Sequence, residues 1–493
     1  MKREQVSKSF FFGSGYSLIS NFYKTLLNFA VIIVFARYLT PYDYAIAALA
    51  ISVINIFRIF ADFSYSDYVI HKASFNNNDS SSFFWMNILF SIFTLLIFSL
   101  IGNALSSFFS TPELTNALLV LSAFLLIESI GFQSRAQLVK NLRFKVISII
   151  DIIASTIGIF ASFILVLLGF EYWALIGVYG LKFVFSHIIS FFYLEWRPKL
   201  EIKFSLLRES IGYCIPLVTS NVVMTITTAI KNGIINNFIG KAELGVFSKA
   251  DKISVLPSMV IIGPLNRLVF PILTKFEINS KEFSDNYLYL ARLVGYLSYP
   301  IATILVFFPS EFITILLGQN WIIAIPVFKG LSLACFAYCA SNLCRWLFLT
   351  SGNTRRLFYV NIFRLLLFSG VISYFSKFGI LAVAYAYSAT ELILRLPTIY
   401  YAKLGSGIKL LDIIKSQMAP IFTSLCAVFV PLVVWKKLDS DNLLIFMTVI
   451  PILYISIFVV LTIRQKFIKK FLASIEFWEF LKKLSIFKNK NRI

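Results

Sequence analysis

Long apolar stretches follow one another along almost the whole chain, from Ser9 to Leu461, with little polar sequence between them. About fourteen of them are roughly 20–28 residues long, and a helix of that length crosses the ~30 Å hydrocarbon core of a bilayer. Backbone groups in lipid must be satisfied within the segment, so these stretches predict helices. The short connections leave no aqueous domain in which an enzyme could act on soluble substrates.

Both termini are predicted to lie in the cytoplasm. The predicted spans are residues 9–36, 42–65, 82–109, 115–139, 144–169, 171–195, 209–238, 243–274, 284–308, 322–350, 356–377, 379–402, 413–435 and 442–464. An even number of spans puts both ends of the chain on one side. Lysines and arginines concentrate in the connections on that side, which makes it the cytoplasmic side. The formal net charge of +21 therefore has a membrane explanation and does not indicate nucleic acid.

A short internal match indicates two related halves. Tyr38–Ala45 and Phe238–Gly245 are both tight turns with an acidic residue near their end, about 200 residues apart, between the first and second spans of a six-helix set. Both halves start on the same side, so the repeat is parallel. The predicted fold is an all-α integral membrane protein with two six-helix bundles around a central cationic cavity. The predicted units are an N-terminal bundle at 1–204, a C-terminal bundle at 205–404, membrane helices thirteen and fourteen at 405–465, and an amphipathic basic cytoplasmic tail at 466–493.

Three predicted helices carry polar side chains at steps of three and four, which place them on one face. These side chains are Ser14, Ser17, Asn21, Lys24 and Asn28 on the first helix, Ser52, Asn55, Arg58, Asp62 and Ser66 on the second, and Asn221, Thr225, Thr228, Asn232 and Asn236 on the seventh, with Lys231 beside them. Such faces line a hydrated cavity or pack against each other, because lipid cannot solvate them.

Cations within the spans point to an anionic ligand. Lys24, Lys182, Lys231, Arg345 and Arg364 have no carboxylate within four residues. A charge near mid-bilayer costs roughly 2.5–3.5 kcal/mol on insertion scales, so such residues usually face a cavity. A diphosphate would meet several of them with charge-assisted hydrogen bonds.

Other charged residues in the spans leave alternatives open. Arg58 is positioned to pair with Asp62 at a spacing of four residues. Arg267 and Arg345 lie near the ends of predicted helices. Their side chains could extend to the membrane interface instead of lining a cavity. Asp62 and Asp251 are candidates for ion coupling, but structural pairing with a basic group is the favoured interpretation. The five cysteines form no CxxC pattern, so neither a metal site nor a cofactor is expected.

Seven segments of the chain carry recognisable motifs. They are Phe60–Lys72, which reads FADFSYSDYVIHK, and then, in order, Leu138–Phe144, Gly169–Leu175, Trp196–Pro198, Phe238–Ser248, Arg267–Pro271 and Leu317–Trp321. Together these segments resemble the motifs of the Wzx-type O-antigen and capsule flippases, most closely the branch of colanic-acid exporters. Phe60–Lys72 is similar to that family's FADFGLSxAxIQ motif, with Ser64 where the family commonly has glycine and His71 where it has glutamine.

The resemblance implies a member of the multidrug/oligosaccharidyl-lipid/polysaccharide exporter superfamily in the bacterial inner membrane. It implies movement of an undecaprenyl-diphosphate-linked glycan to the outer leaflet, with polysaccharide polymerase and chain-length proteins as possible partners. The family's cavity cations on the first, second, seventh and eighth helices would correspond to Lys24, Arg58, Lys231 and Arg267. A proton or a sodium ion is the candidate for coupling.

Three other functions compete with this one. A flippase for the peptidoglycan lipid precursor has similar chemistry, but the polysaccharide-type motifs disfavour it. A cation-coupled drug exporter of the same superfamily would place an acid in the heart of one lobe, where the first helix has Lys24 instead. A membrane polymerase or glycosyltransferase would need a large outward loop, and the longest outward loop, around Ser310–Ile322, carries only Glu311 as an acid.

Overall fold

A computed structural model describes residues 3–71, 79–141, 143–259, 273, 276–350, 354–438 and 443–463, and within these residues the regular structure is helical. Twelve helical stretches of this part of the chain are long and apolar enough to cross a membrane. Of the two other predicted spans, 243–274 begins as α9 (Lys241–Ser254) and continues outside the described residues, and 442–464 forms α19 (Leu443–Ile463). The chain is therefore an all-α, multi-pass membrane protein, as predicted.

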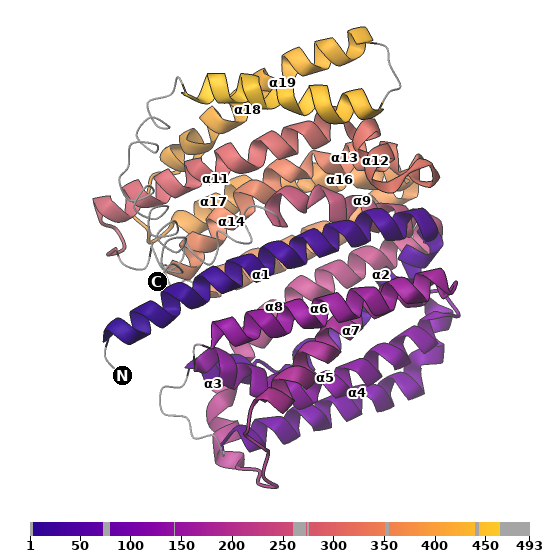
Figure 1. The fold of residues 1–493 in the computed structure, drawn as a ribbon, viewed down its shortest axis with the longest axis vertical. Coiled ribbons are helices and arrows are strands. Elements are labelled where there is room, and N and C mark those ends of the chain that lie inside the picture. Colours follow the sequence, from indigo (N-terminus) through magenta and orange to yellow (C-terminus); the bar gives the residue numbers. More distant parts are fainter. Residues whose placement is uncertain are drawn as a thin grey trace, which may run out of the picture.

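The helices form two groups, which we call the N-lobe and the C-lobe after the predicted bundles (Figure 1). The exact domain boundaries stay a prediction, and the predicted tail at 466–493 lies outside the described residues. The N-lobe contains α1 (Arg3–Tyr38), α2 (Pro41–Asp62), α3 (Tyr65–His71), α4 (Ser80–Phe108), α5 (Leu114–Lys140), α6 (Phe144–Leu167) and α7 (Glu171–Tyr193).

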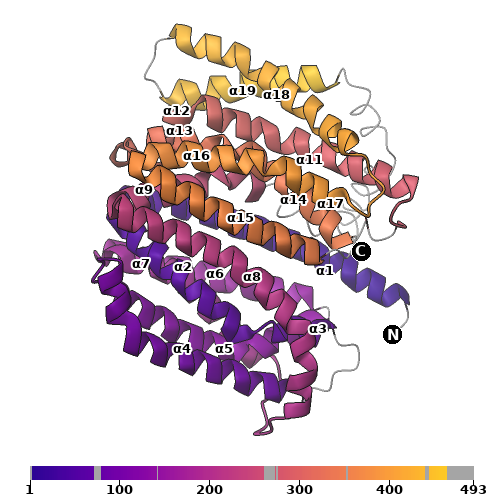
Figure 2. The same cartoon turned by 180° about the vertical axis from the view of Figure 1, so that it is seen from behind.

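The C-lobe begins with α8 and continues to α17. Its elements are α8 (Phe204–Phe238), α9, α11 (Lys281–Phe307), α12 (Pro309–Leu317), η3 (Gln319–Trp321), α13 (Ala324–Ser332), α14 (Ala334–Thr350), α15 (Thr354–Phe375), η4 (Ser376–Phe378), α16 (Ile380–Ile393) and α17 (Arg395–Lys403). The last two described helices, α18 (Leu410–Leu438) and α19, pack together on the side of the C-lobe, where α18 contacts α11. Figures 1 and 2 show this pair in yellow at the top.

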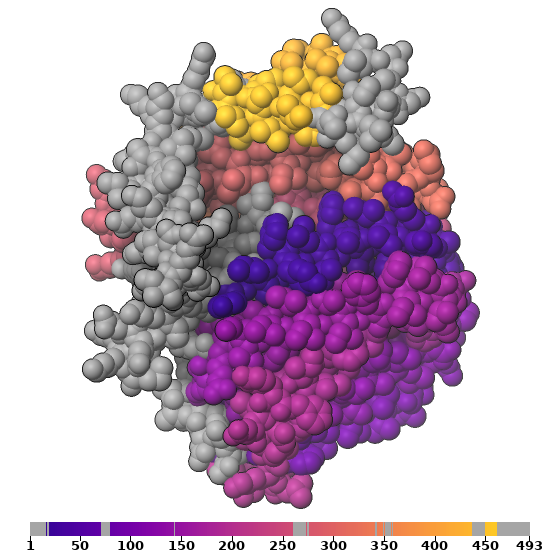
Figure 3. All heavy atoms as spheres, viewed as in Figure 1, coloured from indigo at the N-terminus to yellow at the C-terminus, as the bar shows by residue number. Residues whose placement is uncertain are grey.

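Two helices lie at the junction of the lobes on opposite faces of the molecule. α1 contacts α6 of the N-lobe and α12 of the C-lobe, and the space-filling view shows it as an indigo band between the two lobes (Figure 3). On the other face, α8 contacts α2 of the N-lobe and α15 of the C-lobe (Figure 2). Any cavity between the lobes is therefore bounded by α1 on one side and α8 on the other.

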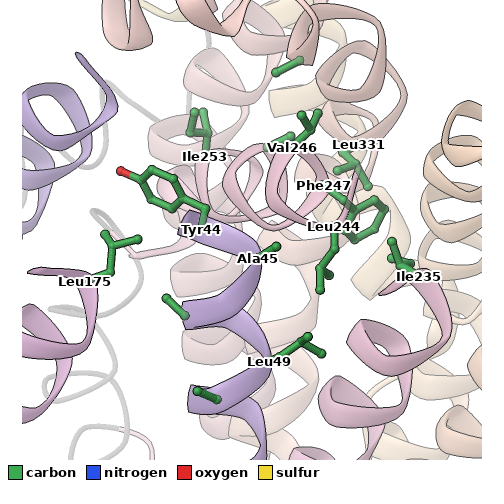
Figure 4. Close-up of a cluster of buried hydrophobic side chains, with 14 of the residues drawn as sticks. Tyr44, Ala45, Leu49, Leu175, Ile235, Leu244, Val246, Phe247, Ile253 and Leu331 are labelled. Carbon is green, nitrogen blue, oxygen red and sulfur yellow. The ribbon is translucent and has the colours of Figure 1, made fainter. Parts of the chain in front are cut away.

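The lobes meet at the predicted outer end through the two turns of the internal repeat. The N-terminus of α9 packs so closely on that of α2 that a Cβ on Gly245 would lie 1.6 Å from the carbonyl oxygen of Pro41, so only glycine fits there. The indole of Trp321 donates a hydrogen bond of 2.7 Å to the carbonyl of Ala36. The largest buried apolar cluster crosses this junction; Figure 4 shows part of it, with Leu49 and Leu244 from opposite lobes. We call this region the outer seal.

The second predicted span ends differently from the prediction. We expected one helix over 42–65, but α2 ends at Asp62 and α3 starts at Tyr65 after a sharp turn. Phe63 and Ser64 both adopt positive φ values, +47° and +55°. The prediction ended the span at residue 65, and apolar periodicity continues across the turn, so the pattern did not locate the break after Asp62.

The connection between the lobes is fixed to the N-lobe. The backbone N–H groups of Lys199 and Lys203 donate to the hydroxyls of Ser81 and Ser82 at 3.0 and 2.9 Å. The ammonium of Lys203 also donates to the Asp79 carboxylate at 2.8 Å, and this hydrogen bond raises the pKa of Lys203. The connection therefore moves with the start of α4.

Candidate functional site: two cationic pockets

The larger pocket lies in the N-lobe and has a volume of about 610 Å³. Its walls come from α1, α2, α3, α5, α6 and α7, and Asn221 of α8 completes them. It extends toward Ser64, Asp67 and Ile70, in the turn and helix that follow α2 at the predicted cytoplasmic end. Pockets of this size hold small-molecule ligands or headgroups. We call it the N-pocket.

Two cations on one wall of the N-pocket share a single carboxylate. The Lys24 ammonium of α1 and the Arg135 guanidinium of α5 each lie 2.7 Å from an oxygen of Asp151 on α6. Arg135 also donates to the Ser186 hydroxyl at 2.6 Å. The Lys24 side chain is 26% exposed, so a ligand in the pocket can reach it. One positive charge is left over in this group.

The two other cations of the N-pocket, Arg58 and Lys182, lie close to one aromatic ring. Arg58 of α2 lies 2.9 Å from Glu128 and its guanidinium stands 3.7 Å from the centroid of the Phe183 ring. The ammonium of Lys182 lies 5.1 Å from the same centroid. Among the residues that the structure describes, Lys182 forms no ion pair with a carboxylate. Lys182 is thus the cation of the N-pocket whose charge is least compensated.

The prediction that cations within the spans lack carboxylate partners was wrong for Lys24, Lys231 and Arg364. Their partners are Asp151, Asp251 and Glu391, all too far along the chain to be found from local spacing. Arg58 pairs with Glu128, and the expected partner Asp62 instead accepts a hydrogen bond of 2.6 Å from Ser66. Asp62 and Asp67 add negative charge to the N-pocket near the α2–α3 turn. The excess of positive charge is therefore confined to the part of the pocket around Lys182 and Asp151.

The smaller pocket, about 110 Å³, lies in the C-lobe between α8, α15 and α16. We call it the C-pocket. Lys231 and Arg364 line it together with Thr228, Asn361 and Tyr387. Four of the predicted cations therefore divide between two pockets, with Lys24 and Arg58 in the N-lobe and Lys231 and Arg364 in the C-lobe.

Both cations of the C-pocket are held by carboxylates that do not line it. Lys231 pairs with Asp251 of α9, which confirms a pairing role for that acid. Arg364 pairs with Glu391 of α16, and the same carboxylate accepts from Arg395 at 2.6 Å. Glu391 is fully buried and thus serves two arginines, as Asp151 serves two cations in the N-lobe.

Only some of the remaining predicted site residues line a pocket. Asn28 lines the N-pocket and Thr228 the C-pocket. Asn55 accepts a hydrogen bond from Tyr179, and Asn232 donates to the carbonyl of Ala48 at 3.4 Å across the lobe junction. Three further candidates belong to neither pocket as described: Asn21 is half-buried on α1, Arg345 is exposed on α14, and Arg267 lies outside the described residues.

Two pocket residues were missed by the sequence analysis. Arg135 lies inside the predicted span 115–139 but was not named as a candidate, and the structure places it in the wall of the N-pocket. Lys182 was noted as an unpaired charge within a span but was not named as a binding residue, and the structure places it in the wall of the N-pocket. The acids Glu128 and Asp151 lie within predicted spans and gave the available signal, since an acid at membrane depth predicts a basic partner elsewhere.

The fold and the pockets define a class of protein: a helical membrane transporter with a cationic pocket in each of two lobes. The protein-family model for "Polysaccharide biosynthesis protein" matches residues 34–326, and the chain belongs to that family. Over 444 residues it is 22% identical to an uncharacterized membrane protein of the cps region of Klebsiella pneumoniae, covering 87% of this chain and 90% of that one. It is 20% identical to the lipopolysaccharide biosynthesis protein WzxC of Escherichia coli, covering 72% and 73%.

A solved structure supports the fold. The lipid II flippase MurJ, in an inward closed conformation, matches 91% of this chain and 97% of its own with a TM-score of 0.72 at 16% sequence identity. The chain therefore shares the fold of this flippase. At this identity the likeness concerns the fold alone.

Proposed function

We propose that this chain moves an undecaprenyl-diphosphate-linked oligosaccharide, an O-antigen or capsule repeat unit, from the inner to the outer leaflet of the bacterial cytoplasmic membrane. The observation that carries the proposal is the N-pocket, where Lys182 has no carboxylate partner in the described residues and Lys24 and Arg135 share Asp151. A diphosphate is a dense anion with several acceptor oxygens, which suits such a cluster. Membership in a polysaccharide biosynthesis family supports the glycan.

The diphosphate would bind beside Lys182 and Arg58, and the lipid tail would remain in the bilayer. The N-pocket opens toward the predicted cytoplasmic end, while the outer seal closes the other end. Rocking of the lobes would open the outer seal and close the cytoplasmic side. The step needs no covalent chemistry, and a proton or a sodium ion is the proposed coupling partner if the movement is driven.

The test is loss of the Lys182 charge. Lys182→Gln removes one charge-assisted interaction, so binding of a polyprenyl diphosphate should weaken about ten- to a hundredfold. Affinity for geranylgeranyl diphosphate would be measured on the purified full chain, and surface polysaccharide would be measured in cells that express the variant at the normal level. Both should fall together.

Two variants control this experiment. Lys182→Arg keeps the charge and should retain most of the binding. Lys329→Gln removes an exposed lysine on α13, outside both pockets, and should leave binding and polysaccharide unchanged. An unchanged diphosphate affinity in Lys182→Gln would contradict the proposed role of the N-pocket.

A further inference from the structure

One wall of the C-pocket carries a buried hydrogen-bond donor. Asn361 is 7% exposed, and its amide Nδ2 has no acceptor among the residues that the structure describes. A buried donor left unsatisfied is destabilising, so such groups are normally matched by a ligand or an ordered water. Because Asn361 lines the C-pocket, a ligand or a water molecule in this pocket has to supply the missing acceptor.

The wall of the C-pocket is positive. Lys231 and Arg364 line it, while their partners Asp251 and Glu391 do not. Arg395 also forms an ion pair with Glu391. Among the described residues, Lys231, Arg364 and Arg395 therefore have only two carboxylates between them. A guanidinium has five N–H donors and an ammonium has three, and the ion pairs use only some of them. The ligand that fits these donors is an anion with acceptor oxygens.

The size of the C-pocket excludes a whole headgroup. Its volume of about 110 Å³ compares with roughly 300–1,000 Å³ for pockets that enclose small-molecule ligands. It accommodates one functional group of a larger molecule. The ring of Tyr387, 5.0 Å from the Lys231 ammonium, forms part of the wall against which a sugar ring can lie.

The two pockets lie along the same helix. Asn221 of α8 lines the N-pocket, and Met224, Thr228 and Lys231 of α8 line the C-pocket. Lys231 is about 15 Å further along the helix axis than Asn221, at 1.5 Å per residue. It also lies nearer the outer seal. A short glycan whose diphosphate occupies the N-pocket would therefore extend past the C-pocket.

We propose that the C-pocket binds a carboxylate carried by the glycan, and thus that the transported repeat unit contains an acidic sugar. This inference rests on the proposed function and specifies its substrate class. Lys231 and Arg364 supply the charge, and Asn361 and Thr228 supply hydrogen bonds. A free anion of similar size has the same chemistry, so the experiment must separate the two sources.

The first experiment measures binding of sodium glucuronate, glucose and sodium phosphate to the purified full chain at constant ionic strength, by equilibrium dialysis. Glucuronate should bind at least about ten times more tightly than glucose, because the charged hydrogen bonds are lost with the neutral sugar. Asn361→Leu and Thr228→Val should each weaken glucuronate binding several-fold. Thr390→Val is the matched control, because the Thr390 hydroxyl bonds its own helix at Ala386 and does not line the pocket.

The outcomes separate the alternatives. Equal binding of glucose and glucuronate, or unchanged glucuronate binding in both variants, would overturn the proposal. Binding of phosphate without glucuronate would assign the pocket to a free anion and would also overturn it. Lys231 is left unchanged in these tests because its removal would strand Asp251.

A second experiment uses transport specificity. Proteoliposomes would be loaded with a lipid-linked repeat unit that contains a uronate, or with the same unit after chemical reduction of its carboxyl group. The acidic unit should move at least about ten times faster, and Asn361→Leu should shrink this ratio. Geranylgeranyl diphosphate binding is measured on the same protein. Weaker diphosphate binding in Lys182→Gln tests the proposed function. Unchanged diphosphate binding in Asn361→Leu shows that the C-pocket acts separately. A ratio near one with intact diphosphate binding would reject the acidic sugar alone.

Discussion

Two carboxylates each join charged residues from several helices. Asp151 of α6 binds Lys24 of α1 and Arg135 of α5, and Glu391 of α16 binds Arg364 of α15 and Arg395 of α17. A shared carboxylate neutralises only one of its two cations. It therefore stabilises the helix packing and still leaves positive charge in or beside a pocket. This arrangement explains how the lobes tolerate cations at membrane depth.

Removal of such a carboxylate should be costly. Glu391→Gln would leave two arginines without their counter-ion in a buried place, and breaking a buried ion pair from one side costs about 3–5 kcal/mol. We expect a marked fall in the thermal unfolding midpoint of the purified protein, measured by intrinsic fluorescence. Glu282→Gln, at an exposed position on α11, is the control and should leave the midpoint unchanged. A Glu391→Gln protein as stable as the original would show that the shared ion pair contributes little.

The polar stripes predicted part of the N-pocket and could not predict its ion pairs. Lys24, Asn28 and Arg58 were found because helical spacing places them on one face, and this depends on residues close in sequence. The Lys24–Asp151 pair joins residues 127 positions apart, so it depends on how α1 packs against α6. Arg267, placed by the family resemblance, lies outside the described residues and stays a prediction.

At the scale of the helix, the turn between α2 and α3 shapes the mouth of the N-pocket. Ser64 lines the pocket, has φ of +55°, and its carbonyl accepts a weak hydrogen bond from Cys214 at 3.6 Å. L-residues pay roughly 1–2 kcal/mol in the left-handed region, and glycine does not. The glycine common at this position in the resembling family fits the observed backbone.

Ser64→Gly and Ser64→Ala should therefore differ in stability. Both remove the hydroxyl, but only glycine relieves the backbone, so the glycine variant should be more stable than the alanine variant by about 1 kcal/mol. Unfolding midpoints of the two purified variants test this. The same pair at Ser129, buried within α5, is the control and should show the reverse order, because glycine weakens a helix interior. Greater stability of Ser64→Ala than of Ser64→Gly would contradict the assigned strain.

Helix existence followed from the sequence more reliably than helix boundaries. Apolar length predicted a helix near each of α4, α5, α6 and α7, because the bilayer requires that length. It did not predict that α8 begins at Phe204, before the predicted start at residue 209, nor that α13 and α14 are separated at Leu333. Breaks inside a continuous apolar run depend on contacts between helices, and hydropathy does not record those contacts.

For the whole molecule, the outer seal is the contact that the proposed rocking of the lobes would have to break. Its most unusual member is Lys249 of α9, which is 1% exposed and donates to the carbonyl of Ile32 at 3.0 Å and to the Tyr44 hydroxyl at 2.8 Å. Its ammonium also lies 4.2 Å from the centroid of the Tyr44 ring. In the part of the chain that the structure describes, Lys249 forms no ion pair with a carboxylate. Separation of the lobes would hydrate this charge, which lowers the cost of opening relative to a purely apolar seal.

A cross-link across the outer seal should therefore stop transport without unfolding the protein. The Lys241 ammonium lies 3.4 Å from the Tyr42 hydroxyl at the rim of the seal, and the two residues belong to opposite lobes. A Tyr42→Cys/Lys241→Cys pair, joined by a short reducible reagent, should abolish flipping of a fluorescent polyprenyl-diphosphate lipid in proteoliposomes, and reduction should restore it. The control pair is Asn103→Cys/Thr115→Cys, whose native side chains lie 3.3 Å apart within the N-lobe. Because the control link constrains one lobe only, it should leave flipping intact. Continued flipping with a fully formed Tyr42→Cys/Lys241→Cys link would mean that the outer seal does not open during transport.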